Sequence, residues 1–336
     1  MKNLSFLNKI LFLVNSLLAT LLLLSFCLPF IAPKTISALV VLSIFVPLLV
    51  LINGFFIIYW ILNLKKQFLL STFILVIGMF ISSPIYKFKS NNSSLNNDLK
   101  IMSFNVKAFD LFTNKKDSLH PKKGFDFIIE NDPDILLFQE FFNYKELPIN
   151  FPYKYVKTKS ERNYFGMAIF SKYKIVNSGS LNFKNTSNNI IFTDILKEKD
   201  TIRIYNVHLE SLKIKPYENN FGEENSEKLI KRIANSFQKQ AVQTNQFLEH
   251  EKGWNGKKII CGDFNNTAYS WVYKQISKNK KDAFIEAGKG FGKTFDYWFP
   301  MRIDFILTDA TATINKFTTF SEEFSDHYPI QAKINW

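Results

Sequence analysis

Residues 259–266 read IICGDFNN, where an apolar run ends abruptly in Asp263, Asn265 and Asn266. Short apolar runs of this kind are typical of buried strands. An unpaired polar group inside a protein costs about 1–3 kcal/mol, so a strand that stayed in the core would not end in a carboxylate and two carboxamides. The stretch therefore predicts either a capped turn or a functional site at the end of a buried strand.

Polar side chains end or interrupt apolar runs at several other places in residues 99–336. These runs are IMSFNV with Asn105, LLFQE with Glu140, IYNVHLES with His208 and RIDFIL with Asp304, and a further stretch, FSDHYP, adds Asp326 and His327. Such side chains bind metals, carry protons or donate hydrogen bonds. If the runs end at one rim of the sheets, the groups would form a metal-assisted hydrolytic site.

Each residue, taken alone, also has an ordinary structural interpretation. Asn105, Asp263 and Asn265 are then turn residues that hydrogen-bond their own backbone, Glu140 an exposed acid at a strand end, His208 a core histidine with satisfied hydrogen bonds, and Asp326 with His327 the start of a turn before Pro329. These interpretations must all hold independently, whereas one shared site accounts for the residues together.

Apolar runs alternate with polar, periodic stretches from Leu99 to Trp336. We predict strands at 99–106, 135–140, 166–172, 190–196, 201–209, 257–264 and 302–308, and helices around 121–131 and 225–250. The second helix would place Leu229, Ile233, Phe237, Ala241 and Phe247 on one face. Several strands are continuously apolar, which is typical of covered sheets, so we expect one α/β domain.

The first 86 residues have a different composition. Residues 10–33, 35–64 and 67–86 carry no charged side chain and form segments of 24, 30 and 20 residues. A membrane-spanning helix needs about 20 mostly apolar residues, so we predict three transmembrane helices that anchor the chain in a lipid bilayer. For the first segment a cleaved signal peptide is the alternative, although its apolar part exceeds the roughly 7–15 residues of such peptides.

The Ser- and Asn-rich residues 87–98 are typical of a polar linker, so the predicted limits are 1–86 for the anchor, 87–98 for the linker and 99–336 for the α/β domain. Lysines predict the orientation: Lys2, Lys9, Lys65 and Lys66 fall on one side, and Lys34, Lys87 and Lys89 on the other. Because lysines concentrate in cytoplasmic loops, the larger group is expected inside, with the α/β domain on the non-cytoplasmic side of a bacterial inner membrane.

Charge and cysteine content narrow the partners only slightly. Residues 99–336 hold 35 basic and 28 acidic residues, an excess that favours anionic substrates but equally suits ordinary solubility. The two cysteines, Cys27 and Cys261, predict no disulfide framework. No protein partner can be inferred from these features.

With these motifs in this order, the chain resembles the endonuclease/exonuclease/phosphatase superfamily, which shares the fold of DNase I. The motifs are SFNV, LFQE, GMAIFSK, NVHLES, GDFNN, RIDFIL and SDHYP, and they span the whole second part of the chain. The combination of GDFN, RIDFIL and SDH is the specific part, whereas SFN or QE alone would be weak. The resemblance implies a four-layer α/β sandwich and hydrolysis of a phosphoester with Mg²⁺ or Mn²⁺.

The resemblance also implies a role for each site residue. Glu140 would be the principal metal ligand, with Asn105 beside it and Asp326 contributing to the metal site. These are oxygen ligands, which suit a hard divalent cation.

The catalytic roles implied by the resemblance fall on five further residues. Asp263 would orient or deprotonate the attacking water, and Asn265 would hydrogen-bond the phosphoryl oxygens. Asp304 would orient His327, which would bind a phosphate oxygen, and His208 would protonate the leaving group.

The substrate is less constrained than the reaction. His208 stands where exonuclease III-like enzymes carry a tyrosine in a different motif, which puts abasic-site repair in doubt and is more similar to DNase I, sphingomyelinases and inositol phosphatases. The expected substrate contains phosphate: a lipid head group, a nucleic acid or a small phosphoester. The alternatives are a membrane-anchored nuclease and a catalytically silent module that binds a phosphate ligand.

Overall fold

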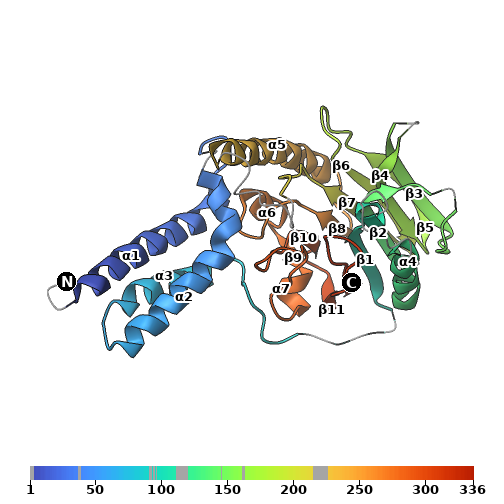
Figure 1. Cartoon of the computed structure of the whole chain (residues 1–336). Helices are drawn as coiled ribbons and strands as arrows, with labels where there is room; N and C mark the ends of the chain where they lie inside the picture. The colour runs from blue at the N-terminus through green and yellow to red at the C-terminus, as the bar shows by residue number, and fades with distance from the viewer. Residues whose placement is uncertain are drawn as a thin grey trace.

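The computed structural model describes residues 4–36, 39–90, 93, 95, 97–110, 120–144, 146–160, 163–214 and 226–336. A rod of three helices projects from a larger domain built on two sheets (Figure 1). The rod contains α1 (Phe6–Cys27), the short 3₁₀ helices η1 (Leu28–Phe30) and η2 (Leu39–Phe45), α2 (Val46–Leu62) and α3 (Phe68–Ile81).

Among the described residues, two stretches of the rod are long and apolar enough to cross a membrane, Phe6–Phe30 with 25 residues and Leu39–Leu62 with 24. The prediction of three such helices is wrong on this count, because α3 has 14 residues. At 1.5 Å per residue it is about 21 Å long, less than the roughly 30 Å of a hydrocarbon core. It ends at Ile81 because the chain becomes extended at Ser82, two residues before Pro84.

Buried polar side chains hold the rod together. Asn15 of α1 donates from Nδ2 to Ser71 Oγ of α3 at 2.7 Å and accepts from Trp60 Nε1 of α2 at 2.9 Å. Ser71 in turn donates to Asn53 of α2 at 2.8 Å. Side-chain hydrogen bonds of this kind link helices in an apolar environment, so the three helices form one packed unit.

Two six-stranded sheets form the larger domain. The first, ordered β11-β12-β1-β2-β4-β3, contains β1 (Leu99–Asn105), β2 (Ile135–Phe142), β3 (Tyr153–Ser160), β4 (Asn163–Ser171), β11 (Thr313–Thr319) and β12 (Ile330–Asn335). The second, ordered β5-β6-β7-β8-β10-β9, contains β5 (Lys174–Ser180), β6 (Asn189–Lys197), β7 (Asp200–His208), β8 (Lys258–Asp263), β9 (Lys280–Asp282) and β10 (Asp304–Asp309). Both sheets are mixed, because β1 is parallel to β2 and β7 to β8.

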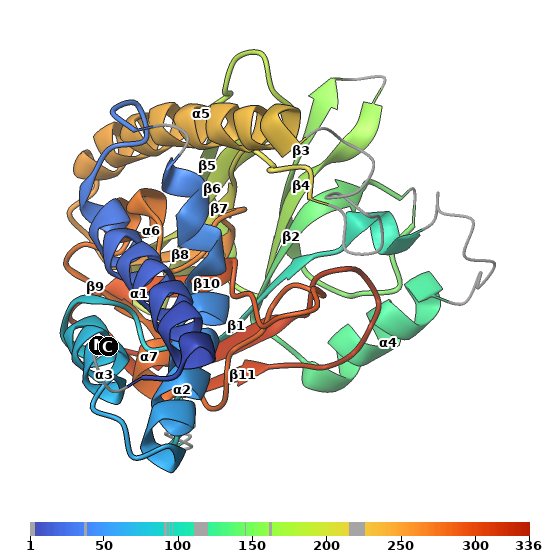
Figure 2. The ribbon, with the colours of Figure 1, turned by 60° about the vertical axis from the view of Figure 1, so that its left-hand side comes forward.

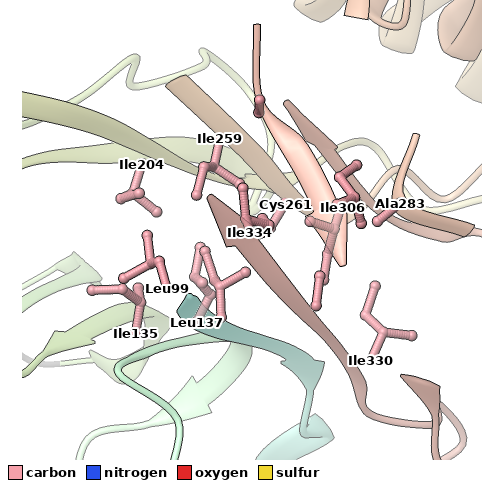
Figure 3. Packing of buried hydrophobic residues seen from close by; sticks show 14 of the residues in the cluster. Leu99, Ile135, Leu137, Ile204, Ile259, Cys261, Ala283, Ile306, Ile330 and Ile334 are labelled. Carbon is pink, nitrogen blue, oxygen red and sulfur yellow. The ribbon is translucent and has the colours of Figure 1, made fainter. Parts of the chain in front are cut away.

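The sheets pack face to face through branched aliphatic side chains. Figure 3 shows Leu99 and Ile135 of the first sheet opposite Ile204 and Ile259 of the second, all fully buried. The outer elements are η3 (Lys107–Asp110), α4 (His120–Asn131), α5 (Ser226–Lys252), α6 (Trp271–Ile276) and α7 (Ala283–Ala287). Helix α4 covers the first sheet, whereas α5 and α6 cover the second (Figure 2). This arrangement of helix, sheet, sheet and helix matches the expected four-layer α/β sandwich.

The parallel pairs explain why polar strand ends gather at one rim. Asn105 of β1 is in register with Gln139 of β2, and His208 of β7 is in register with Asp263 of β8. Gly262 makes the second pairing possible, because its φ is +134° and a Cβ there would lie 2.0 Å from the carbonyl oxygen of Val207. The carboxyl ends of both pairs therefore meet at one edge of the sandwich.

Candidate active site

Asp263, at the end of β8, is the centre of a connected group of polar side chains. Its Oδ2 accepts a hydrogen bond from Asn105 Nδ2 at 3.0 Å. The same oxygen lies 3.7 Å from His208 Nε2 and 3.7 Å from His327 Nε2. The first sheet thus contributes Asn105, the second contributes Asp263 and His208, and the loop before β12 contributes His327.

Glu140 is aimed into this group by an irregularity of its strand. The register of β2 against β4 shifts between Phe138 and Phe141, and Glu140 has a φ of +49°, which is uncommon for a residue with a side chain. Its Oε1 lies 3.4 Å from Asn105 Nδ2 and 3.6 Å from His208 Nε2. The side chain is 43% exposed, so its carboxylate is accessible from solvent.

His327 is held by a carboxylate on the side away from Asp263. Its Nδ1 lies 3.0 Å from Asp304 Oδ2, at the start of β10. The imidazole also packs against Phe295, with ring centroids 5.0 Å apart. Because Asp304 occupies Nδ1, Nε2 is the nitrogen left to face the group around Asp263.

Asn265 and Asp326 line a pocket of about 90 Å³ whose wall also includes Glu140 and His327. The backbone N–H of Asn265 donates to Asp263 Oδ1 at 2.6 Å, and its side chain donates to the carbonyl of Leu209 at 2.9 Å. Asp326 pairs with Lys107 Nζ at 2.9 Å. All eight predicted site residues therefore lie together, although Asp326 is linked to the rest through Lys107, whose N–H donates to Asn105 Oδ1 at 3.2 Å.

Burial and neighbouring charges give the two histidines different protonation states. Burial lowers the pKa of His208 below its ordinary value, against the opposing effect of Glu140, so this imidazole is neutral in the free protein. Burial acts in the same direction on His327, but the carboxylates of Asp304 and Asp263 outweigh it and raise its pKa to about 10. Burial also raises the pKa of Asp263 to about 7, with His327 opposing. The site thus combines a cationic imidazole, a neutral one and a carboxyl group that titrates near neutrality.

Two sets of side chains could bind a metal ion. Asp263, Asp304 and His327 place ligand atoms within 4.8 Å of one another, which differs from the predicted set of Asn105, Glu140 and Asp326. The first set is fully buried, and Asp304 is already engaged with His327 Nδ1. In the predicted set the Glu140 carboxylate reaches the pocket, whereas Asn105 Oδ1 accepts from the Lys107 N–H and Asp326 pairs with Lys107 Nζ.

The polar atoms around His208 Nε2 fit a bound cation or phosphoryl group. Within the described residues His208 Nε2 is buried without a hydrogen-bond partner, at 3.6 and 3.7 Å from the two carboxylates. These separations are too long for hydrogen bonds, so the two carboxylates lie close to this nitrogen without pairing with it. Native proteins seldom leave such a buried atom unpaired, so the residues present fit a cation or a phosphoryl oxygen.

Sequence reasoning missed a polar network beneath the site. Gln139 donates to Asn206 Oδ1 at 2.6 Å across the two sheets, and Asn206 donates to the carbonyls of Phe138 at 2.9 Å and Ala168 at 3.0 Å. Gln139 precedes Glu140, Asn206 lies two residues before His208, and each interrupts an apolar run. This pattern could have identified both residues from the sequence. Lys107 and Lys213 at the pocket were missed because isolated surface lysines carry no pattern.

The sequence model of the Endonuclease/Exonuclease/phosphatase family matches residues 102–327, which include every residue of the site from Asn105 to His327. The chain belongs to this family. The family assignment confirms the resemblance seen in the motifs, and the enzymes of the Endonuclease/Exonuclease/phosphatase family act on phosphoesters. A second model, described as a domain of unknown function (DUF8431), matches residues 8–85. A search among curated proteins found no match.

Several solved structures are similar in fold to this chain. The catalytic domain of human Nocturnin with bound sulfate is 17% identical with a TM-score of 0.53, over 74% of this chain and 96% of that one. Humanized D. rerio TDP2 is 17% identical with a TM-score of 0.53, over 71% and 99%. The mannosyl-6-phosphatase Bt3783 of Bacteroides thetaiotaomicron is 18% identical with a TM-score of 0.50, over 71% and 100%. At these identities the likeness concerns the fold.

Proposed function

We propose that the protein is a metal-dependent phosphoesterase, acting on a phosphodiester, with Mg²⁺ or Mn²⁺ held by Glu140 together with Asn105 and Asp326. The proposal is carried by the approach of Glu140 and Asp263 to His208 Nε2, which has no hydrogen-bond partner among the described residues, with the cationic His327 3.7 Å from Asp263. The metal would neutralise charge on the phosphoryl group. A phosphoester is anionic and repels hydroxide, so such neutralisation and a positioned water are what the reaction requires.

The chain's own residues would share the remaining work. Asp263, with a pKa near neutrality, would orient the attacking water and accept its proton. His327, held by Asp304, would hydrogen-bond a phosphoryl oxygen, as would the side chain of Asn265 at the pocket wall. His208 is neutral in the free protein, so it could protonate the leaving group only after a bound phosphate had raised its pKa.

We also propose that the N-terminal rod is a membrane anchor and retain the limits 1–86, 87–98 and 99–336. Large apolar side chains project from the rod; examples are Phe6 at 80% exposure, Leu62 at 77% and Phe80 at 85%. An exposed apolar surface of this extent is unusual for a soluble protein and suits contact with lipid. Packing of α1 against α2 and α3 supports an anchor over a cleaved signal peptide.

Membrane topology can be tested at the linker. We expect a cysteine at the exposed position Lys89, introduced with Cys27→Ser, to react with a membrane-impermeant thiol reagent in cells whose outer membrane is permeabilised. The reason is that Lys2, Lys9, Lys65 and Lys66 are expected in the cytoplasm, and Lys89 lies on the opposite side when α3 completes a third crossing despite its 14 residues. Native Cys261 is buried and gives little background. Labelling only after lysis would reverse the orientation.

Substrate choice separates the proposal from its alternatives. We expect the full-length protein in detergent with Mg²⁺ to have a higher kcat/KM for a lipid-head-group or other small phosphodiester than for abasic duplex DNA, because the pocket of about 90 Å³ is small and the domain is attached to a rod. The panel should include a sugar phosphate monoester and be run at one salt concentration, since DNA affinity depends steeply on salt. A tenfold preference for DNA would favour the anchored nuclease. Binding of phosphate without turnover of any substrate would favour the silent binding module.

A further inference from the structure

The η2 segment, Leu39–Phe45, forms the N-terminal end of the apolar stretch Leu39–Leu62, yet it packs against the catalytic domain. Its buried side chains Val40, Val41 and Ile44 belong to one apolar cluster with residues of α5 and of the loop before β10. In Figure 1 the rod meets the domain beside α5 and α6. A segment that served only as a tether would have no reason to bury side chains there.

A direct hydrogen bond joins this segment to the loop that follows β8. Thr267 Oγ1 donates to the carbonyl of Ser43 at 3.1 Å, and both residues are 1% exposed. Thr267 comes two residues after Asn265 and four after Asp263, in the loop that places both groups at the pocket. Because both ends of the bond are buried, its loss would leave an unpaired carbonyl or hydroxyl in the interior.

The same segment supports the apolar wall of the pocket. Leu212, Phe295, Met301 and Ile303 line the pocket and belong to the cluster that contains Val40, Val41 and Ile44. Phe295 also contacts the candidate catalytic His327 through an isolated β-bridge and the ring contact described above. Phe45 packs on Phe299 of this loop, with ring centroids 6.3 Å apart.

Two further contacts make the attachment extensive. Lys87, after α3, forms a two-way backbone pair with Gly290, and both N–H···O distances are 2.9 Å. The N-terminal half of α5 buries Leu229, Ile233 and Phe237 in the cluster that contains Val40, Val41 and Ile44. Without this segment, part of the apolar face of α5 would be open to water.

We infer that the η2 segment is a structural part of the catalytic centre, with Ser43 and Thr267 as positioning residues for the Asp263–Asn265 loop and Ile44 as a support of the pocket wall. The segment acts through these contacts and not on the substrate itself. This inference rests on the proposed function for its kinetic readout but not for its structural one. It predicts that catalysis depends on the contacts between the η2 segment and the catalytic domain.

The hydrogen bond is tested by Thr267→Val in the full-length protein, with a chromogenic phosphodiester and Mg²⁺. We expect kcat per folded protein to fall about tenfold, since small displacements of reacting groups lower rates strongly. Thr267→Ser keeps the hydroxyl and should restore at least half of kcat. The matched control is Thr193→Val, a fully buried threonine whose hydroxyl has no hydrogen-bond partner in the described residues. Equal kcat in Thr267→Val and Thr193→Val would overturn the inference for this pair.

The role of Ile44 in the pocket wall is tested by comparing Ile44→Ala with Ile74→Ala. The two isoleucines are similarly buried, at 3% and 4% exposure, but Ile74 lies in α3, outside the cluster that backs the pocket. Both should lower thermal stability, but only Ile44→Ala should lower kcat/KM, by about fivefold, as the wall shifts into the cavity. An equal effect of both variants on kcat/KM would show that Ile44 contributes to stability alone.

Hydrogen exchange supplies a readout that does not require turnover. Backbone amides of residues 263–270 should exchange faster in Thr267→Val than in the wild type or in Thr193→Val, because the loop has lost its anchor. Unchanged exchange would overturn the inference even in an active enzyme. If the wild type hydrolysed no phosphoester, the proposed function would fail, and the exchange rates alone would decide the positioning role of Thr267.

Discussion

Replacing Asp263 by asparagine is expected to lower kcat for phosphoester hydrolysis by roughly 10³-fold, because proton transfer and charge positioning are each worth about 10²–10⁴ in rate. Asparagine has the shape of aspartate and keeps an oxygen for the N–H of Asn265, which donates to Asp263 Oδ1 at 2.6 Å. It cannot accept the proton of a water, and it removes the negative charge that faces His327. The loss should therefore appear in kcat, with little loss of folded protein.

The matched control for this variant is Asp126→Asn, the same chemical change at an exposed position of α4. It should retain wild-type activity within about twofold, as surface substitutions usually have small effects. Combining Asp263→Asn with His327→Ala should cost less than the product of the two single losses, because the groups act as one unit. A single variant Asp263→Asn with more than a tenth of wild-type kcat would show that the centre of the site is misplaced.

Removing the carboxylate of Glu140 is expected to raise the Mg²⁺ concentration for half-maximal activity by about 10²-fold or more, because even the loss of a group that only orients a metal ligand costs about 10–100-fold in affinity. Glu140→Gln keeps the size of the side chain and its contact with Asn105, where Oε1 now lies 3.4 Å from Nδ2. Activity of the wild type should vanish in EDTA and return with Mg²⁺ or Mn²⁺. Calorimetric titration with Mn²⁺ provides the direct binding measurement.

Glu130→Gln, at an exposed position of α4, is the control for the change in net charge and should leave the metal requirement unaltered. Zinc should not substitute efficiently for Mg²⁺, because the proposed ligands are oxygens with no thiolate among them. Undiminished hydrolysis in EDTA would contradict metal dependence. An unchanged Mg²⁺ requirement in Glu140→Gln would move the metal to the alternative set of Asp263, Asp304 and His327.

Strands with long apolar runs could be predicted from the sequence, but edge strands could not. The predicted strands at 99–106, 135–140 and 257–264 are confirmed as β1, β2 and β8, whose residues are almost all buried. The β3 strand lies at the edge of its sheet with no fully buried residue and reads YKYVKTKS, a polar pattern that periodicity does not separate from a loop. Strand β9 has three residues, too few for any pattern.

Most of the predicted site residues could be recognised because each interrupts or ends an apolar run where a core residue would be expected, whereas Asp326 and His327 were predicted from the motif FSDHYP. Their proximity follows from strand register, which joins Asp263 to both His208 and Asp304. The ion pair of Lys107 with Asp326 and the backbone bulge that aims Glu140 were not recognisable, since they depend on local geometry and not on residue type.

By itself the sequence determined the apolar N-terminal region, the α/β domain and the chemistry of the strand ends. Hydrophobic periodicity and charge are properties of residues that lie close together in the chain, so they are visible without the tertiary structure. It also determined that α5 has an apolar face, and Leu229, Ile233 and Phe237 are indeed buried. Only the tertiary structure decided that this face packs partly against the η2 segment, and that Ser43 holds Thr267, 224 positions along the chain. Such contacts are decided by shape and by the burial of surfaces from distant segments, for which a linear pattern contains no pairing information.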